Sequence, residues 1–313
     1  YTEGITGDFI STTNGTTWAT PGVSPSAWGE TVLRDFGFTQ RGGVISSNGL
    51  ITYLSSAPAL LTFDGATETL LATLSLGSFS IQSGPVMHDG VPYFVVHDAT
   101  SGKLLRQAGS AVEEVTTAIG KPPTCVASIL GRVYIGTDED RIYYWSESEG
   151  LVLDVTLSPT GGSVTITDIA HSNGIVYATA CTKTGSTTAT THKVLKRTAD
   201  GAWTDITPTA QGDYGPIAHF DSGLYVVRNT HDTFTGCEVR LYDGTSWTTT
   251  FDVTSIVTGA RNAISLVAWN NALYATVGGT TSRDVIRNFG GTWTRVHTEV
   301  TFTTQYYTAL GFY

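Results

Sequence analysis

The sequence contains little charge. Asp, Glu, Lys and Arg together make up 14% of the 313 residues, against about 25% in an average soluble domain. The 17 Lys and Arg residues form no basic run, and the net charge is −10. A protein that follows the phosphates of a nucleic acid needs clustered cations, so we expect no nucleic-acid partner.

Long hydrophobic runs and cysteine pairs are also missing. A membrane-spanning helix needs about 20 consecutive apolar residues. No stretch approaches that length, so we expect no membrane insertion. Cys125, Cys181 and Cys237 include no Cys-x-x-Cys pair, which predicts small buried side chains and no disulfide framework. The chain opens at Tyr1 rather than Met, as expected of a processed product or a fragment.

Helical periodicity is absent as well. An amphipathic helix needs apolar residues three and four positions apart over at least about ten residues. Strand-like runs such as residues 142–145 dominate instead, and Val, Ile, Thr and Tyr are frequent. Pairs such as Asp243-Gly244 mark tight turns, because a type I′ turn needs positive φ at both central positions. The pattern predicts an all-β protein.

One phrase recurs six times: a tight turn followed by a short strand that carries a tyrosine. Successive tyrosines lie 40 to 49 residues apart, at Tyr53, Tyr93, Tyr134, Tyr177, Tyr225 and Tyr274. This period is typical of the four-stranded antiparallel blades of a β-propeller. The chain ends on the same phrase at residues 311–313, and residues 7–18 supply the other half of a blade. We therefore predict a seven-bladed β-propeller whose ring is closed by N- and C-terminal strands, with six blades as the alternative.

The repeat also predicts the domain organisation, a single domain over residues 1–313. Residues 1–22 form the outer half-blade and residues 23–41 a long connector. The six complete blades are expected at residues 42–74, 83–118, 124–156, 164–207, 214–254 and 262–299.

Strand direction divides the connections between two rims. The turns between first and second strands, and between third and fourth strands, are short and lie on one rim, which we call the tight-turn rim. The remaining connections are longer and more varied, and they lie on the opposite rim, the variable rim. Because rigid scaffolds usually carry function on loops, the variable rim is the predicted binding face.

Three histidines, His88, His171 and His219, fall at similar positions near the end of the first strand of their units. Three histidines are a potential metal ring. Other units place residues such as Ser128 and Trp269 there, so we predict packing or hydrogen bonding and no metal site.

Carboxylates gather in several predicted loops. Asp138 and Asp140 lie in the second-to-third loop of the third unit, and Asp232 follows His231 in that of the fifth. Asp168 lies early in the first strand of the fourth unit, at the expected channel mouth. Such groups are candidate calcium ligands, or an acid and base for glycoside hydrolysis. The other interpretation is solvated loop charge, and we expect no cofactor.

A sialidase would need arginines that converge on the substrate carboxylate. Arg283 and three others, Arg34, Arg41 and Arg261, are placed on the variable rim, but their spacing identifies no triad.

A second hairpin, which ends in tryptophan, recurs at residues 11–18, 200–203, 243–247 and 290–293. It resembles a degenerate Asp-box, the Ser-x-Asp-x-Gly-x-Thr-Trp motif of sialidase-type propellers. Ser11, Gly15, Thr17 and Trp18 match the motif, whereas Thr13 stands at the Asp position. In that family the motif marks the fold and is not catalytic, so these tryptophans are predicted to pack between blades. The Thr- and Gly-rich, charge-poor style also resembles tail, nozzle and fibre proteins of bacterial viruses.

These patterns favour a non-enzymatic binding or assembly module, extracellular or on a virion, that recognises a protein or a surface glycan through the variable rim. Aromatic and carboxylate side chains suit such contacts, and the candidates are Trp28, Asp138, Asp140, Asp168, Tyr214, His231, Asp232 and Arg283. These residues do not repeat from blade to blade, which disfavours a multivalent lectin. A propeller glycoside hydrolase, a sialidase-like enzyme or a lectin remains the alternative.

Overall fold

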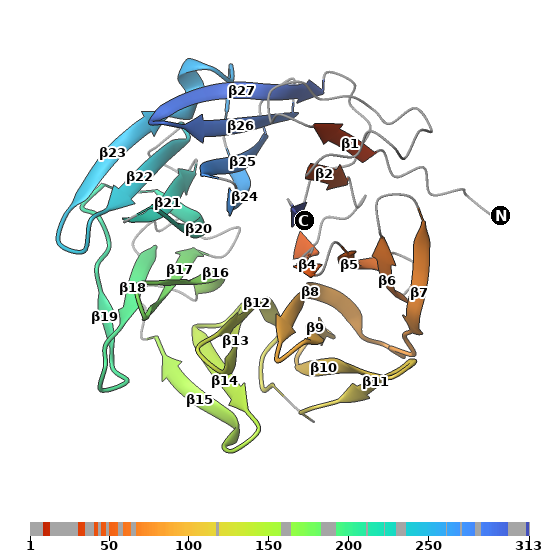
Figure 1. The fold of residues 1–313 in the computed structure, drawn as a ribbon. Helices are drawn as coiled ribbons and strands as arrows, with labels where there is room; N and C mark the ends of the chain where they lie inside the picture. Colours follow the sequence, from red (N-terminus) through yellow and green to blue (C-terminus); the bar gives the residue numbers. More distant parts are fainter. Residues whose placement is uncertain are drawn as a thin grey trace.

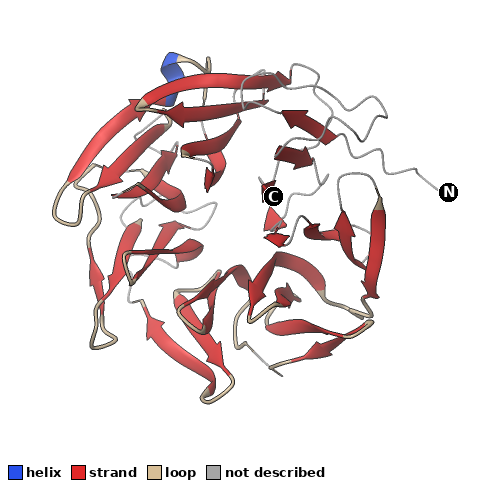
Figure 2. Ribbon diagram, viewed as in Figure 1, coloured by secondary structure: helices blue, strands red, loops and turns tan. Residues whose placement is uncertain are grey.

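The structure is a computed structural model of the chain. It describes residues 9–12, 31–34, 41–42, 45–47, 50–55, 59–63, 67–116, 119–157, 164–182, 192–210, 212–221, 223–229, 236–260, 262–269, 271–278, 283–299 and 311–312. Within these segments the chain is built almost entirely from strands and loops (Figure 2). The helical element drawn there is a single 3-10 turn, Val253–Ser255. The Asp252 carboxylate caps its start by accepting the backbone N–H of Thr254. Among the described residues no helix is long and apolar enough to cross a lipid bilayer.

The strands form separate sheets arranged in a ring around a central axis (Figure 1). Six sheets contain four or five strands each. In each of them, four strands that follow one another along the chain pair antiparallel. We number these sheets blades one to six in chain order. The arrangement confirms the predicted all-β propeller fold with four-stranded antiparallel blades.

The first three blades follow the predicted boundaries closely. Their strands are β4 (Ile45–Ser47), β5 (Leu50–Ser55), β6 (Ala59–Phe63) and β7 (Glu68–Thr73) in blade one; β8 (Ser80–His88), β9 (Val91–His97), β10 (Gly102–Ala108) and β11 (Ala111–Glu114) in blade two; and β12 (Pro123–Ile129), β13 (Arg132–Thr137), β14 (Arg141–Ser146) and β15 (Gly150–Thr156) in blade three.

The next three blades also follow the predicted boundaries closely. Their strands are β16 (Val164–Ser172), β17 (Ile175–Thr182), β18 (Lys193–Arg197) and β19 (Trp203–Asp205) in blade four; β20 (Asp213–Phe220), β21 (Gly223–Asn229), β22 (Glu238–Tyr242) and β23 (Trp247–Asp252) in blade five; and β24 (Asn262–Trp269), β25 (Ala272–Gly278), β26 (Arg283–Phe289) and β27 (Thr292–Glu299) in blade six.

A further sheet joins the two ends of the chain. Its strands β1 (Phe9–Thr12), β2 (Thr31–Arg34) and β28 (Gly311–Phe312) pair in the order β1-β2-β28. Strands from both termini therefore share one sheet, as the closed ring requires. Because only three strands of this sheet are described, the count of seven blades stays a prediction.

Strand β2 lies within residues 23–41, which the sequence predicted to be one long connector. That prediction is wrong, because the partners that make Thr31–Arg34 a strand come from distant parts of the sequence. Strand β3 (Arg41–Gly42) joins the end of that connector to Gly42, which was expected to begin the first blade. It pairs instead in parallel with β8 and adds a fifth strand to blade two.

The hydrophobic core is divided into layers between neighbouring blades. Alternate residues of one strand face opposite layers. In β13, Tyr134 packs in the layer between blades three and four, whereas Val133 and Ile135 pack between blades two and three. Because both faces of a middle strand are covered, its burial is nearly continuous.

The repeated tryptophans Trp203, Trp247 and Trp293 lie in these layers, as predicted, whereas Trp18 lies outside the described residues. Trp293 is 7% exposed and stacks on Phe251 of the neighbouring blade, with ring centroids 5.2 Å apart. The Trp247 indole N–H donates to the Ile206 carbonyl, which lies at the end of the preceding blade. The cysteines carry no disulfide, and Cys125 and Cys237 are buried.

Candidate functional site

The three repeated histidines are hydrogen-bonded within the protein. His88 Nδ1 lies 3.1 Å from Ser128 Oγ of the next blade. His219 Nδ1 lies 2.7 Å from Ser172 Oγ of the preceding blade, and His171 Nε2 accepts the backbone N–H of Gly174 at 3.1 Å. These contacts confirm the predicted hydrogen-bonding role. The part of the chain that the structure describes contains no cluster of His, Cys, Asp and Glu suited to a metal ion.

The Asp168 carboxylate accepts hydrogen bonds from the main chain of two blades. Oδ1 accepts the N–H of Ile169 at 2.9 Å, and Oδ2 accepts the N–H of Ile217 in blade five at 3.1 Å. This carboxylate therefore links blades four and five.

Asp140 makes a similar link between blades three and four. Its Oδ1 accepts the N–H of Val164 at 2.5 Å, and its backbone N–H and C=O bond to Val164 and Leu157. Burial raises the pKa of this carboxyl. Asp138 lies in the same loop, where its backbone N–H donates to the Pro122 carbonyl.

Tyr214 is a core residue. Its side chain is 0% exposed, and its hydroxyl donates to the Ala210 carbonyl at 2.5 Å. Burial raises the pKa of this phenol. A side chain without exposed surface cannot form an aromatic platform for a ligand, so the prediction that Tyr214 is a surface contact is wrong in this structure.

The remaining candidates are described only in part. Trp28, His231 and Asp232 lie outside the described residues. Arg283 begins β26, where its backbone pairs with Gly278 and Glu299. The structure thus brings no two of the predicted site residues together around a cavity that it describes.

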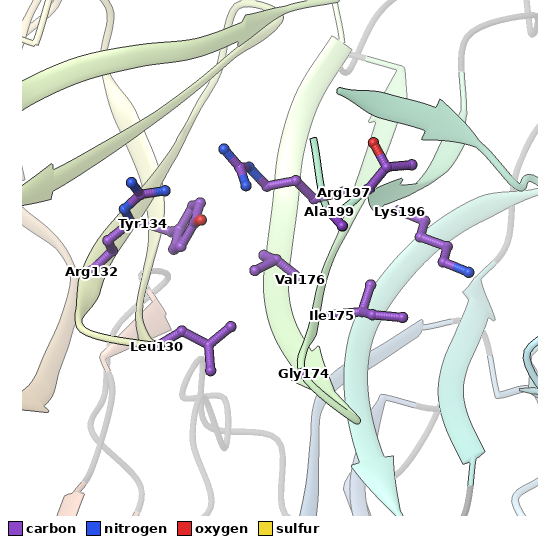
Figure 3. A pocket seen from close by; sticks show the side chains of 10 residues that line it. Leu130, Arg132, Tyr134, Gly174, Ile175, Val176, Lys196, Arg197 and Ala199 are labelled. Carbon is purple, nitrogen blue, oxygen red and sulfur yellow. The ribbon is translucent and has the colours of Figure 1, made fainter. Parts of the chain in front are cut away.

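A groove of about 500 Å³ lies between blades three and four. It opens at the tight-turn rim, opposite the predicted binding face. Figure 3 shows Arg132 and Tyr134 projecting from the blade-three side and Arg197 projecting toward them from blade four. The lining residues include two arginines and one lysine but no Asp or Glu. They are Leu130, Arg132, Tyr134, Gly174, Ile175, Val176, Lys196, Arg197, Thr198 and Ala199.

The arginine on the blade-three side is held by neighbours on its own blade. Arg132 Nη2 donates to Glu149 Oε2 at 2.8 Å, and its guanidinium lies 4.1 Å from the centre of the Tyr144 ring. The Tyr144 hydroxyl donates to Glu149 Oε1 at 3.0 Å. This hydrogen bond lowers the pKa of Glu149, whereas burial and the same bond raise the pKa of Tyr144.

The arginine on the blade-four side reaches across to blade three. Arg197 Nε and Nη2 donate to the two oxygens of Asp154 at 2.8 and 2.9 Å, and Trp203 Nε1 donates to the same carboxylate at 2.7 Å. Asp154 is 6% exposed and Arg197 18%. The hydrogen bonds to Asp154 raise the pKa of Arg197, so the guanidinium is fixed in its charged form.

The groove therefore offers rigid guanidinium groups and apolar side chains. Among its lining residues the only hydroxyls are those of Tyr134 and Thr198, and Thr198 Oγ1 donates to the Ala202 carbonyl at 2.8 Å. Thr198 Oγ1 also donates to the carboxylate of Asp200, which is not among the lining residues. No histidine lines the groove as a base. The arrangement suits the binding of an anionic or amphipathic group. The sequence interpretation missed this groove, because its walls come from segments that lie more than a blade apart along the chain.

Comparison with known proteins gives the fold and no family. No protein-family model matches the sequence, and no curated protein matches it. The solved structures similar to this chain include virginiamycin B lyase from Staphylococcus aureus, with 13% identity, a TM-score of 0.63, and coverage of 83% of this chain and 86% of that one.

Two further neighbours belong to other functional classes. YCF48 bound to D1 peptide has 12% identity, a TM-score of 0.56 and 83% coverage of both chains. The GH74 xyloglucanase from Xanthomonas campestris has 16% identity and a TM-score of 0.58; the match covers 86% of this chain but 46% of the xyloglucanase. At these identities the likeness is one of fold, and it is shared by enzymes and by a peptide-binding protein.

Proposed function

We propose that this chain is a non-enzymatic binding or assembly module that holds a protein partner, outside the cell or on a virion. The proposal rests on the hydrogen bonding of Asp168, the carboxylate that the sequence places best for catalysis. Both of its oxygens accept main-chain N–H groups, one of them across a blade boundary. A carboxylate committed to such bonds is poorly placed to act as acid or base.

Further features support a binding role. The described groove combines guanidinium groups with apolar side chains, and no histidine or cysteine is among its lining residues. One structural neighbour is bound to a peptide, which fits a protein partner. The burial of Tyr214 removes one of the two aromatic contacts expected for a sugar. The charge-poor composition supports the extracellular or virion setting.

The test combines particle size with turnover. The protein from its native source is sized by gel filtration and light scattering, and the isolated chain is assayed on a glycan panel beside Asp168→Asn. We expect a larger particle and no turnover by either chain. Turnover by the native chain that disappears in a folded Asp168→Asn variant would establish a propeller hydrolase or lyase and overturn the proposal.

A further inference from the structure

One tight turn carries a residue of the wrong type for its backbone. Four blades place a non-glycine residue at positive φ directly after their first strand: Asp89 (49°), Leu130 (52°), Asn173 (50°) and Asp221 (54°). The sequence has Asn48 and Asn270 at the corresponding positions of the other two blades. Asn and Asp tolerate this left-handed conformation, whereas larger side chains resist it. Leu130 is therefore the exception among six related positions.

Leu130 buries little apolar surface on folding. Its side chain is 62% exposed, which makes it the most exposed of the large hydrophobic residues described. An apolar side chain kept in a strained turn and in contact with water has no evident role in stability. Such a local conflict with the fold points toward function.

The position of Leu130 suggests what that function is. Leu130 lies at the edge of the groove between blades three and four, beside Arg132 (Figure 3). Arg197 Nε and Nη2 donate to Asp154, and within the described residues its Nη1 donates no hydrogen bond. Lys196 precedes Arg197 in the same strand, and Figure 3 shows its ammonium pointing away from the two arginines. The groove thus holds a guanidinium N–H donor of Arg197 that no described residue accepts, together with the exposed aliphatic side chain of Leu130.

We propose, on the basis of the binding function above, that this edge of blades three and four docks an acidic segment of a protein partner. An aliphatic side chain of the partner packs against Leu130, while a carboxylate meets the cations of the groove. Charge complementarity supports this occupant, because Arg132 and Arg197 keep guanidinium N–H donors beyond those given to Glu149 and Asp154, and a partner carboxylate accepts such donors. Leu130 favours a peptide over a small anion, since a small anion inside the groove would leave that side chain in water.

The proposal predicts opposite effects on stability and binding at one position. Leu130→Asn relieves the turn, so its thermal midpoint should rise, while its binding to the partner segment weakens by about tenfold, as expected for a contact of about 1.4 kcal/mol. The matched control is Asp221→Leu, which makes the reverse exchange at the same turn position of blade five. It should lower the midpoint and leave binding unchanged.

The probe is an immobilised library of acidic peptides in which Leu, Ile or Phe stands between Asp and Glu residues. A second library carries Asn and Gln in their place. The full-length chain should bind members of the acidic library, less tightly as salt screens the charges, and at least about tenfold more tightly than the amide library. Lys196→Gln, which removes a charge on the opposite face of the same strand, should leave that binding unchanged.

Several outcomes would overturn the proposal. One is equal binding to the two libraries, and another is equal affinity of Leu130→Asn and Asp221→Leu for the acidic peptides. Full displacement of the peptides by inorganic phosphate, without any effect of Leu130→Asn, would identify a small-anion site instead. If the native particle forms with Leu130→Asn as with the unaltered chain, this docking site is wrong while the binding function itself stands.

Discussion

At the scale of single residues, the Asp154 carboxylate joins blades three and four by accepting three donors. Arg197 supplies two of them and Trp203 the third. Asp154→Asn leaves the Arg197 charge poorly compensated in a site where the carboxylate is only 6% exposed. We expect the free energy of unfolding to fall by about 3 kcal/mol, the effect of breaking a largely buried pair.

Urea unfolding measures this loss. The exposed pair of Lys103 and Glu114, 2.7 Å apart, provides the comparison, since Glu114→Gln should cost less than about 1 kcal/mol. Losses of similar size for the two variants would show that the Asp154 cluster does not stabilise the junction between the blades.

The turn carboxylates predict a dependence of stability on pH. Asp243 Oδ1 accepts the N–H groups of Ser246 and Thr245, both at 2.8 Å. These bonds lower the pKa of Asp243. A folded pKa below the unfolded value of about 3.9 means that the stabilisation is complete above that pH and is lost as the pH falls through the folded pKa.

An NMR titration of the Asp243 carboxylate should therefore give a pKa below 3.8. As the medium is acidified, the urea midpoint of the native chain should fall more steeply than that of Asp243→Asn. An unshifted titration would show that these hydrogen bonds do not form in solution.

At the scale of strands and blades, the close approach of neighbouring sheets depends on small residues. A Cβ placed on Gly136 in β13 would lie 2.5 Å from Ile166 Cγ2 of blade four and 2.6 Å from Cys125 Sγ. Gly136→Ala should therefore push blades three and four apart and cost about 2 kcal/mol by overpacking.

Gly278 is the matched control, because it also lies near the end of a second strand. Among the described residues, a Cβ there would meet the Asn262 carbonyl alone, at 3.7 Å. Gly278→Ala should leave the urea midpoint nearly unchanged. If Gly136→Ala is equally silent, the layer between blades three and four is looser than described.

The blade boundaries could be predicted because their signals are local. Turn pairs such as Asn173-Gly174 and the alternation of side chains are visible within a few residues of sequence. Strand β2 could not be predicted, since its four residues depend on partners at both ends of the chain.

The candidate site could not be predicted for a similar reason. The burial of Tyr214 and the bond from Ile217 to Asp168 arise only when blades four and five meet. Leu130 did leave a signal in the sequence, because it occupies a turn position where the other five units have Asn or Asp.

At the scale of the whole molecule, the ring depends on the sheet shared by the two termini. Strand β28 pairs with β2 through Thr31–Phe312 and Val32–Gly311. Deletion of residues 311–313 exposes an edge of β2 that the native chain covers. Because an uncovered strand edge invites pairing with another chain, we expect a lower urea midpoint and concentration-dependent association in light scattering. A truncated chain with an unchanged midpoint and no association would mean that the terminal sheet does not close the ring.

The central claim is that the molecule binds a protein partner at the edge of blades three and four. Hydrogen–deuterium exchange of the chain in its native particle, compared with the isolated chain, tests this most directly. The account predicts slower exchange on assembly at residues 130–132, 174–176 and 196–199. Protection confined to the variable rim, at residues 98–101 and 138–140, with the groove exchanging freely, would contradict it.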